Sequence, residues 1–120
     1  MTLLEAIAHI EGFYVTGSRP NRNNNPGDIE WGPFARSHGA TAIETVPAGE
    51  KARFAYFPAP EIGFAALHAL LSSSAYAGLT IEETINKYAP PSENNSANYL
   101  NYVCDNVGCK PTDCVDEVLA

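Results

Sequence analysis

A turn-rich segment over residues 15–39 is the feature that most constrains the fold. At its centre stands the run Asn23-Asn24-Asn25-Pro26-Gly27-Asp28. Asn, Pro, Gly and Asp each favour turns, for different steric or hydrogen-bonding reasons. The segment has neither the apolar repeat of a helix nor the alternation of a strand. We therefore expect an irregular, shaped loop region between regular parts of the chain.

A helix is expected ahead of this loop, from Leu3 to Glu11. The Thr2 and Glu5 side chains have the spacing of a capping box, in which each satisfies an amide donor at the helix start. Apolar residues then repeat at helical intervals up to Gly12, which favours the end of a helix. This places Glu11 at the C-terminal end of the first regular element.

Two strands are expected after the loop, over residues 41–46 and 51–57. Both are rich in β-branched and aromatic side chains, and the turn Pro47-Ala48-Gly49-Glu50 separates them. These features predict a small β-hairpin.

Apolar spacing and capping signals predict four helices in the second half of the chain. Pro60 suits the first turn of one of them, Thr80 caps the second, Gly108 ends the third and Thr112 caps the last. Their expected ranges are residues 61–72, 81–89, 94–107 and 113–119. The order of helix, loop, hairpin and helices predicts an α+β fold with segregated elements, in which the later helices form a bundle.

Length and apolar content favour a single domain over residues 1–120. A chain of 120 residues with 45% apolar side chains can bury one core, whereas two would be cramped. The longest apolar stretch, residues 64–71, is broken by His68 and falls far short of the roughly 20 residues that cross a bilayer. No basic residue precedes the first apolar positions, so no secretory signal peptide is recognisable. We expect a monomer without a membrane partner.

The charge of the chain excludes one large class of partners. The formal net charge is −7 at pH 7, so the sequence lacks a basic surface that could neutralise phosphates. Nucleic acid is therefore not an expected partner. The same acidity is unfavourable for binding to any other anionic surface, because like charges repel.

The three cysteines, Cys104, Cys109 and Cys114, lie close together near the C-terminus. A zinc site usually needs four ligands in paired spacings, and the three histidines are scattered far upstream. We therefore expect no metal and no other cofactor. One local disulfide that leaves a single thiol is the simplest use of these cysteines.

Glu11 is the strongest candidate for chemistry. It is expected at the negative end of a helix dipole, and the aromatic residues Phe13 and Tyr14 follow it. The dipole and the apolar neighbours both disfavour the ionised carboxylate. A carboxylic acid that keeps its proton is what the cleavage of a glycosidic bond needs. The alternative is a surface glutamate near a helix end.

Several short motifs occur in an order typical of one superfamily. They are Glu11-Gly12-Phe13, Asn24-Asn25-Pro26-Gly27-Asp28-Ile29, Phe54-Ala55-Tyr56-Phe57, Gly63-Phe64-Ala65-Ala66-Leu67, and Tyr88-Ala89-Pro90-Pro91 with Asn95 and Tyr99. In these stretches, which together cover residues 6–107, the chain resembles the lysozyme-like superfamily. The resemblance is to small phage and bacterial members: endolysins, muramidases and lytic transglycosylases. The C-terminal tail with its cysteines is not part of that pattern.

The resemblance implies a lysozyme-like fold and an enzyme that cleaves peptidoglycan glycan strands between N-acetylmuramic acid and N-acetylglucosamine. It implies Glu11 as the general acid, no cofactor, and action at the bacterial cell wall, whether in the periplasm, outside the cell or on a phage virion. Two alternatives stay open. A lytic transglycosylase would leave a 1,6-anhydro end, and a non-catalytic lysozyme-like module would bind wall glycan or serve as a virion component.

Asp28 and Glu30 are the candidates for a second catalytic carboxylate. Lysozyme-type hydrolysis uses one about 5–5.5 Å from the acid for retention, or about 6.5–9.5 Å away for inversion. An Asp that follows Pro-Gly commonly serves as a turn residue. Without a second group, Glu11 alone suffices for transglycosylation, because the sugar's own 6-hydroxyl attacks.

Four further residues are candidates for sugar contacts: Asn25, Tyr56, Tyr88 and Asn95. Aromatic faces stack on the apolar faces of sugar rings, and amides pair with hydroxyl and N-acetyl groups. The alternatives are a loop-shaping role for Asn25 and helix capping for Asn95.

Overall fold

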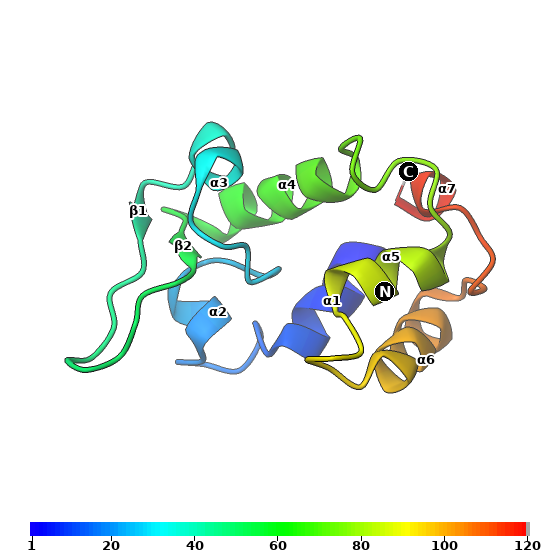
Figure 1. The fold of residues 1–120 in the computed structure, drawn as a ribbon, viewed down its shortest axis with the longest axis horizontal. Coiled ribbons are helices and arrows are strands. Elements are labelled where there is room, and N and C mark those ends of the chain that lie inside the picture. Colours follow the sequence, from blue (N-terminus) through cyan, green and yellow to red (C-terminus); the bar gives the residue numbers. More distant parts are fainter. Residues whose placement is uncertain (120) are drawn as a thin grey trace. The chain divides into compact units, whose positions relative to one another are not determined.

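The structure, a computed structural model, describes residues 1–119, which form seven helices and one two-stranded antiparallel sheet (Figure 1). The predicted α+β class is confirmed. None of the helices in this part of the chain is long and apolar enough to span a membrane. In chain order the elements are α1 (Leu3–Glu11), α2 (Arg19–Arg22), α3 (Pro33–Ser37), β1 (Ala42–Ile43), β2 (Ala55–Tyr56), α4 (Pro60–Leu71), α5 (Ile81–Tyr88), α6 (Ser96–Val107) and α7 (Val115–Leu119).

The chain packs as two compact units. Unit 1 combines Met1–Ile7 with the chain from Leu70 onward, and unit 2 consists of Ala8–Ala69. Helices α1 and α4 each contribute residues to both units, so the division does not follow a linker between elements.

Helix α1 has the predicted bounds, and its capping box is formed. The Thr2 amide donates to Oε1 of Glu5 over 2.9 Å, and the Glu5 amide donates to Oγ1 of Thr2 over 3.1 Å. The helix ends at Glu11 because Gly12 has a φ of +87°, in the left-handed region that favours glycine. Local signals account for both ends of this helix.

The turn-rich segment contains two short helices that its sequence does not predict. Ser18 caps α2 by accepting a hydrogen bond from the Asn21 amide, and Pro20 lies in its first turn. Pro33 begins α3. Each helix is too short for an apolar repeat to be visible in the sequence. Both lie next to the hairpin in unit 2 (Figure 1).

The predicted hairpin is present, but its ladder is much shorter than the predicted strands. Strand β1 pairs with β2 with Ala42 opposite Tyr56, and each strand is two residues long. The Glu44 carboxylate accepts hydrogen bonds from the amides of Arg53 and Phe54 over 2.9 and 2.7 Å. Because a side chain replaces the opposite backbone as acceptor for these two amides, regular pairing ends there.

Helix α4 begins at Pro60, one residue before its predicted start, and packs against the turn-rich loop within unit 2. A β-carbon at Gly63 would lie 1.9 Å from the backbone oxygen of Asn24 and 2.8 Å from Cδ of Pro26. The absence of a side chain at Gly63 therefore lets the loop approach the helix backbone closely. This contact positions the part of the loop that leads to Asp28.

In unit 1, helices α5 and α6 pack against each other. The predicted capping box of α5 is formed by Thr80 and Glu83, and Gly108 ends α6 in a left-handed conformation. The apolar residues that these helices bury include Ile81, Ile85, Tyr99 and Val103.

Helix α7 begins at Val115, later than predicted, so Thr112 is not at its cap position. The Asp113 carbonyl accepts a hydrogen bond from the Ile81 amide over 2.8 Å, and the Val115 amide donates to the Leu79 carbonyl over 2.8 Å. These bonds pair residues 113–115 with the chain at the start of α5. Residues 113 and 114 are therefore not part of the helix, which begins at Val115.

All three cysteines are free thiols, so the expected local disulfide is not formed. The Sγ atoms of Cys104 and Cys109 lie 3.9 Å apart. Burial raises the pKa of Cys104 to about 11, and the neighbouring Cys109 contributes to the rise. Within residues 1–119, no three His, Cys, Asp or Glu side chains form a group that could hold a metal ion.

Candidate active site

Two of the predicted catalytic residues meet in unit 2. The carboxyl group of Asp28 forms a hydrogen bond with that of Glu11, and the negative charge of Glu11 acts on it. Glu11 comes from the end of α1, and Asp28 comes from the turn-rich loop. A hydrogen bond between two carboxyl groups needs a proton on one of them. We call Glu11 and Asp28 the carboxyl pair.

The carboxyl pair holds a proton up to near-neutral pH. Burial raises the pKa of Asp28, and the charge and hydrogen bond of Glu11 raise it further, to about 7. The positive charge of Arg19 acts in the opposite direction. The Oδ1 atom of Asp28 is buried, and no residue among 1–119 forms a hydrogen bond to it. A carboxyl group with these properties suits general acid chemistry.

The backbone of the loop determines where Asp28 points. Asp28 has a φ of +48°, in the left-handed region that Asn and Asp tolerate better than most residues. Its amide donates to the Asn25 carbonyl over 3.2 Å, which closes a turn across Pro26 and Gly27. The turn brings the Asp28 carboxyl group to Glu11.

Asn25 shapes this loop, and its predicted contact with sugar is wrong. Its side chain is fully buried, with 0% of the residue exposed. The Nδ2 group donates to the carbonyls of Ile29 and Ala55 over 2.9 and 3.0 Å, and Oδ1 accepts from the Ile29 amide over 2.9 Å. Because these bonds occupy the amide group, Asn25 ties the loop to β2 and has no surface to offer a ligand.

Near the carboxyl pair lies an ion pair that the sequence did not reveal. Arg19 donates to Glu44 through Nε and Nη2 over 2.8 and 2.6 Å, and its guanidinium carbon lies 4.6 Å from the centre of the Phe54 ring. Glu44 is only 3% exposed. The hydrogen bond from Arg19, together with bonds from backbone amides, lowers the pKa of Glu44 to about 2. The two residues are 25 positions apart, so no local spacing could have indicated their contact.

The site in unit 2 thus consists of a carboxyl pair, a buried asparagine that shapes its loop, and a partly buried ion pair beside it. No family model and no curated protein matches this chain.

Glu30, the other predicted second carboxylate, is engaged elsewhere. Its Oε1 atom lies 2.6 Å from Nε of Arg53, and the two side chains are 61% and 56% exposed. Of the two candidates, the structure brings Asp28 to Glu11 and pairs Glu30 with Arg53 at the surface of the hairpin.

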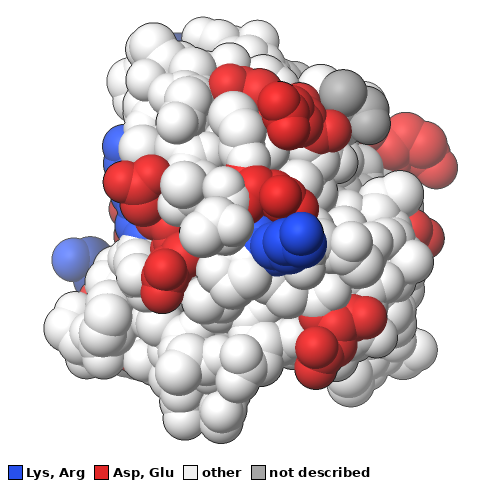
Figure 2. Space-filling view, turned by 90° about the vertical axis from the view of Figure 1, so that its right-hand side faces the viewer, with Lys and Arg blue, Asp and Glu red and all other residues white. Residues whose placement is uncertain are grey.

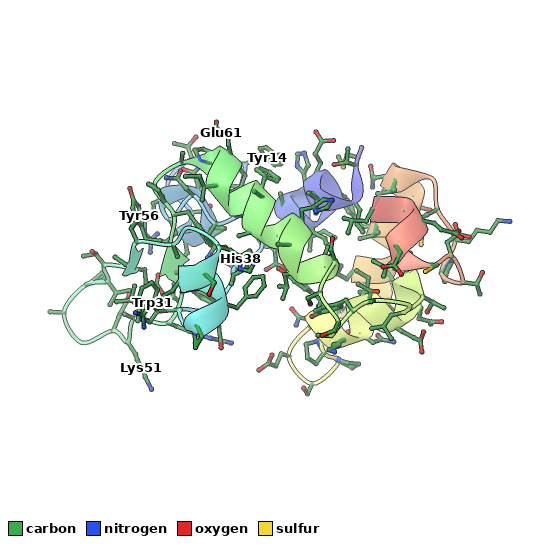
Figure 3. The ribbon with its side chains drawn as sticks, turned by 90° about the horizontal axis from the view of Figure 1, so that it is seen from above. Tyr14, Trp31, His38, Lys51, Tyr56 and Glu61 are labelled. Carbon is green, nitrogen blue, oxygen red and sulfur yellow. The ribbon has the colours of Figure 1, made fainter. Side chains whose placement is uncertain are left out.

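Tyr56 is partly exposed on β2. A side chain that stacks on a sugar ring must be accessible in this way. Figure 3 marks Tyr56 and Trp31 at the hairpin end of unit 2 and Tyr14 toward α1. The exposed fraction of Tyr56 is 37%. Its contact with a sugar stays a prediction.

Tyr88 and Asn95 belong to unit 1. Asn95 is the N-cap of α6, and its Oδ1 atom accepts a hydrogen bond from the Asn98 amide over 3.1 Å, which confirms the capping alternative. Tyr88 is half-buried at the end of α5, with its ring centre 6.5 Å from that of Tyr76. The sugar-binding roles of Tyr88 and Asn95 stay predictions.

The negative charge of the chain is divided unevenly between the two units. Unit 2, which carries the carboxyl pair, has six acidic and five basic side chains. Unit 1 has eight acidic side chains, and its basic residues are Lys87 and Lys110. Figure 2 shows a face on which several groups of carboxylates gather with few basic residues among them. The excess of acidic residues therefore resides almost entirely in unit 1.

Proposed function

We propose that this protein cleaves the glycan strands of bacterial peptidoglycan between N-acetylmuramic acid and N-acetylglucosamine, with Glu11 delivering the proton to the leaving oxygen. A lysozyme-like fold and action at the bacterial cell wall are parts of the same proposal. The observation that carries it is the hydrogen bond between Glu11 and Asp28, in which the pKa of Asp28 is raised to about 7. The acid–base groups of the protein suffice for this chemistry.

In this mechanism the carboxyl pair acts as one acid. The pair retains a proton at pH values where an ordinary Asp, with a pKa of about 3.8, is ionised. Transfer within the hydrogen bond leaves Glu11 protonated and Asp28 as the anion. Glu11 then donates its proton to the glycosidic oxygen as the bond to C1 breaks, and the Asp28 anion stabilises the positive charge that develops on the sugar ring.

The direct hydrogen bond between the two carboxyl groups favours lytic transglycosylation over hydrolysis. Hydrolytic enzymes hold their carboxyl groups about 5–5.5 Å or about 6.5–9.5 Å apart, which leaves room for the reacting groups between them. The carboxyl groups of Glu11 and Asp28 are hydrogen-bonded to each other, and a direct hydrogen bond leaves no space for a reacting group between its donor and acceptor. Hydrolysis therefore requires the pair to separate when substrate binds.

Lytic transglycosylation is the second candidate, and it needs no such separation. After donating its proton, the Glu11 carboxylate accepts the proton of the sugar's 6-hydroxyl group. The oxygen of that hydroxyl attacks C1 and closes a 1,6-anhydro ring. No water is consumed, and one group serves first as acid and then as base.

The charge distribution supports either form of the reaction. An anionic wall repels an acidic enzyme, but unit 2 has nearly equal numbers of acidic and basic side chains. The unit that carries the carboxyl pair is therefore not the one that bears most of the repelling charge.

Mass spectrometry of the soluble products from purified peptidoglycan tests this proposal. Wild type, Glu11→Gln and Glu61→Gln are incubated in parallel, where Glu61 is an exposed carboxylate in the first turn of α4. We expect muropeptides from wild type and from Glu61→Gln, and at least about 100-fold less product from Glu11→Gln. Anhydro ends identify a transglycosylase, and reducing ends identify a hydrolase.

Two outcomes would overturn the proposal. If folded wild-type protein releases no products from several wall types, cleavage is excluded, and a non-catalytic module that binds wall glycan or serves in a virion takes its place. If Glu11→Gln is as active as wild type, Glu11 has no part in the reaction.

A further inference from the structure

A hollow of about 680 Å³ opens between α5, α6 and the loop that joins them in unit 1. Pockets for small ligands usually measure roughly 300–1,000 Å³. The size of this hollow therefore suits a small molecule or a short piece of a polymer. Its walls include Glu82 and Asn86 from α5, Pro91 and Asn94 from the loop, and Leu100 and Asn101 from α6.

The polar lining consists mainly of asparagine amides. Asn86, Asn94, Asn95 and Asn101 all border the hollow. Asn95 uses its Oδ1 atom to cap α6 by accepting from the Asn98 amide. The side-chain amides of the other three are exposed, and they form no hydrogen bond with residues 1–119. Each amide group offers both donors and an acceptor to a ligand.

The charge of the hollow disfavours anionic ligands. Glu82 is a carboxylate in its wall, and no basic side chain of the described chain lines it. Unit 1 has eight acidic side chains against two basic ones. A phosphate or carboxylate ligand would be repelled here, whereas a neutral polar ligand would not.

We propose that this hollow binds N-acetylglucosamine of the wall glycan, the sugar of the two that carries no carboxyl group. The hydroxyl groups and the acetamido group of such a sugar each pair with a donor and an acceptor, which the asparagine amides supply. Leu100 and Pro91 add apolar surface against which the acetyl methyl group and the apolar face of the ring can pack. The choice of this ligand rests on the proposed function, but the hollow and its amides are independent of the carboxyl pair.

An NMR titration of the full chain with chitotriose, a trimer of N-acetylglucosamine, tests the proposal. The Glu11→Gln variant is labelled with ¹⁵N for this purpose, because it should leave the ligand intact. We expect saturable shifts of the side-chain amide signals of Asn86, Asn94 and Asn101. Cellotriose, which has the same ring but no acetamido group, should bind several-fold more weakly.

Variants of the walls give a quantitative check. Asn86→Ala and Asn101→Ala, made in the Glu11→Gln background, should each weaken chitotriose binding about three- to ten-fold, since each removes one or two hydrogen bonds. Asn98→Ala is the matched control, because Asn98 is an exposed asparagine of α6 that does not line the hollow. The three positions are exposed, so the variants should fold like the parent protein, which thermal unfolding verifies.

The outcomes separate this proposal from the proposed cleavage. Shifts confined to unit 2, equal binding of cellotriose, or an equal loss in Asn98→Ala would overturn the sugar site in unit 1. If wild type cleaves peptidoglycan while the hollow shows no shift, the sugar site fails and the cleavage stands. If the hollow binds chitotriose but no cleavage occurs, the sugar site stands and the enzyme proposal fails.

Discussion

Arg19 holds Glu44 through two parallel hydrogen bonds, although 25 positions separate the two residues in the chain. The same carboxylate accepts hydrogen bonds from the amides of Arg53 and Phe54, so one buried side chain joins α2 to the hairpin. Arg19 also lowers the pKa of Asp28 through its charge. This ion pair therefore connects the stability of unit 2 with the chemistry of the carboxyl pair.

Glu44→Gln should lower the free energy of unfolding by about 2–3 kcal/mol, because buried hydrogen bonds to charged groups are costly to lose. Urea unfolding followed by circular dichroism measures the change. Glu30→Gln is the matched control: its ion pair has the same distance of 2.6 Å but is exposed, so we expect a loss below about 1 kcal/mol. Equal losses in the two variants would contradict a dominant effect of burial.

Acid should destabilise unit 2 through the protonation of Glu44. The pKa of Glu44 in the folded protein is about 2, below its ordinary value of 4.5. The stability that Glu44 contributes is therefore complete above about pH 4.5 and is lost as the pH falls from there through about 2. Unfolding free energies across this window should fall more steeply for wild type than for Glu44→Gln. Parallel curves for the two proteins would show that another group is responsible.

Cleavage should decline as the pH rises through about 7, because the carboxyl pair then loses the proton that it must deliver. In Glu11→Gln the pKa of Asp28 should move below 7, since the charge and hydrogen bond of Glu11 are two causes of its rise. Carbon-13 NMR of the Asp28 carboxyl group measures this midpoint in both proteins. An unchanged midpoint would show that the two carboxyl groups do not interact.

The raised pKa of Asp28 also has a consequence for stability, opposite in sign to that of Glu44. Because the folded state binds this proton more tightly, the stabilisation is complete below the ordinary pKa of 3.8 and is lost as the pH rises through about 7. Asp28→Asn should therefore remove a decline in the free energy of unfolding between about pH 4 and pH 7. A decline of the same size in both proteins would contradict this assignment.

Asn25→Ala should lower the free energy of unfolding by about 2–4 kcal/mol, because it leaves buried backbone groups of Ile29 and Ala55 without partners. Asn98→Ala, at an exposed position, should change it by less than about 0.5 kcal/mol. Chemical unfolding of both variants gives the comparison. A fully stable Asn25→Ala protein with weakened sugar binding would restore the substrate role that the structure removes from Asn25.

Oxidation by glutathione disulfide should join Cys104 to Cys109. Their Sγ atoms are 3.9 Å apart, and a disulfide bond of about 2.05 Å requires only a small approach. Two protein thiols are oxidised to one disulfide while glutathione disulfide is reduced to two glutathione thiols, through a mixed disulfide. Because burial raises the pKa of Cys104 to about 11, Cys109 should attack first, and the reaction should accelerate with pH.

Peptide mass mapping identifies the cysteines that oxidation joins. Cys114→Ser should still form the disulfide, and Cys109→Ser should not. A bond that includes Cys114 would contradict the pairing that the sulfur distance favours.

The capped helices could be predicted closely from the sequence, because their signals and their contacts are local. Thr2 with Glu5 and Thr80 with Glu83 are partners three positions apart, and each pair forms both of its hydrogen bonds in the structure. Glu11 could be singled out on the same grounds, since its position depends on where one helix ends. The short length of the two strands and the late start of α7 could not be predicted from the sequence, because distant backbone and side-chain groups form hydrogen bonds with their amides.

The choice between Asp28 and Glu30 depended on the path of the folded loop. Both acids lie near each other in the sequence, but the left-handed φ of Asp28 and the buried bonds of Asn25 bring Asp28 alone to Glu11. No local pattern in the sequence indicated the ion pair of Arg19 with Glu44. Residue type and spacing indicate contacts within a turn or two of the chain. The contacts of Asp28 with Glu11 and of Arg19 with Glu44 form only after separate segments have packed together. Packing also gives a carboxyl group the burial and the neighbours that set its pKa.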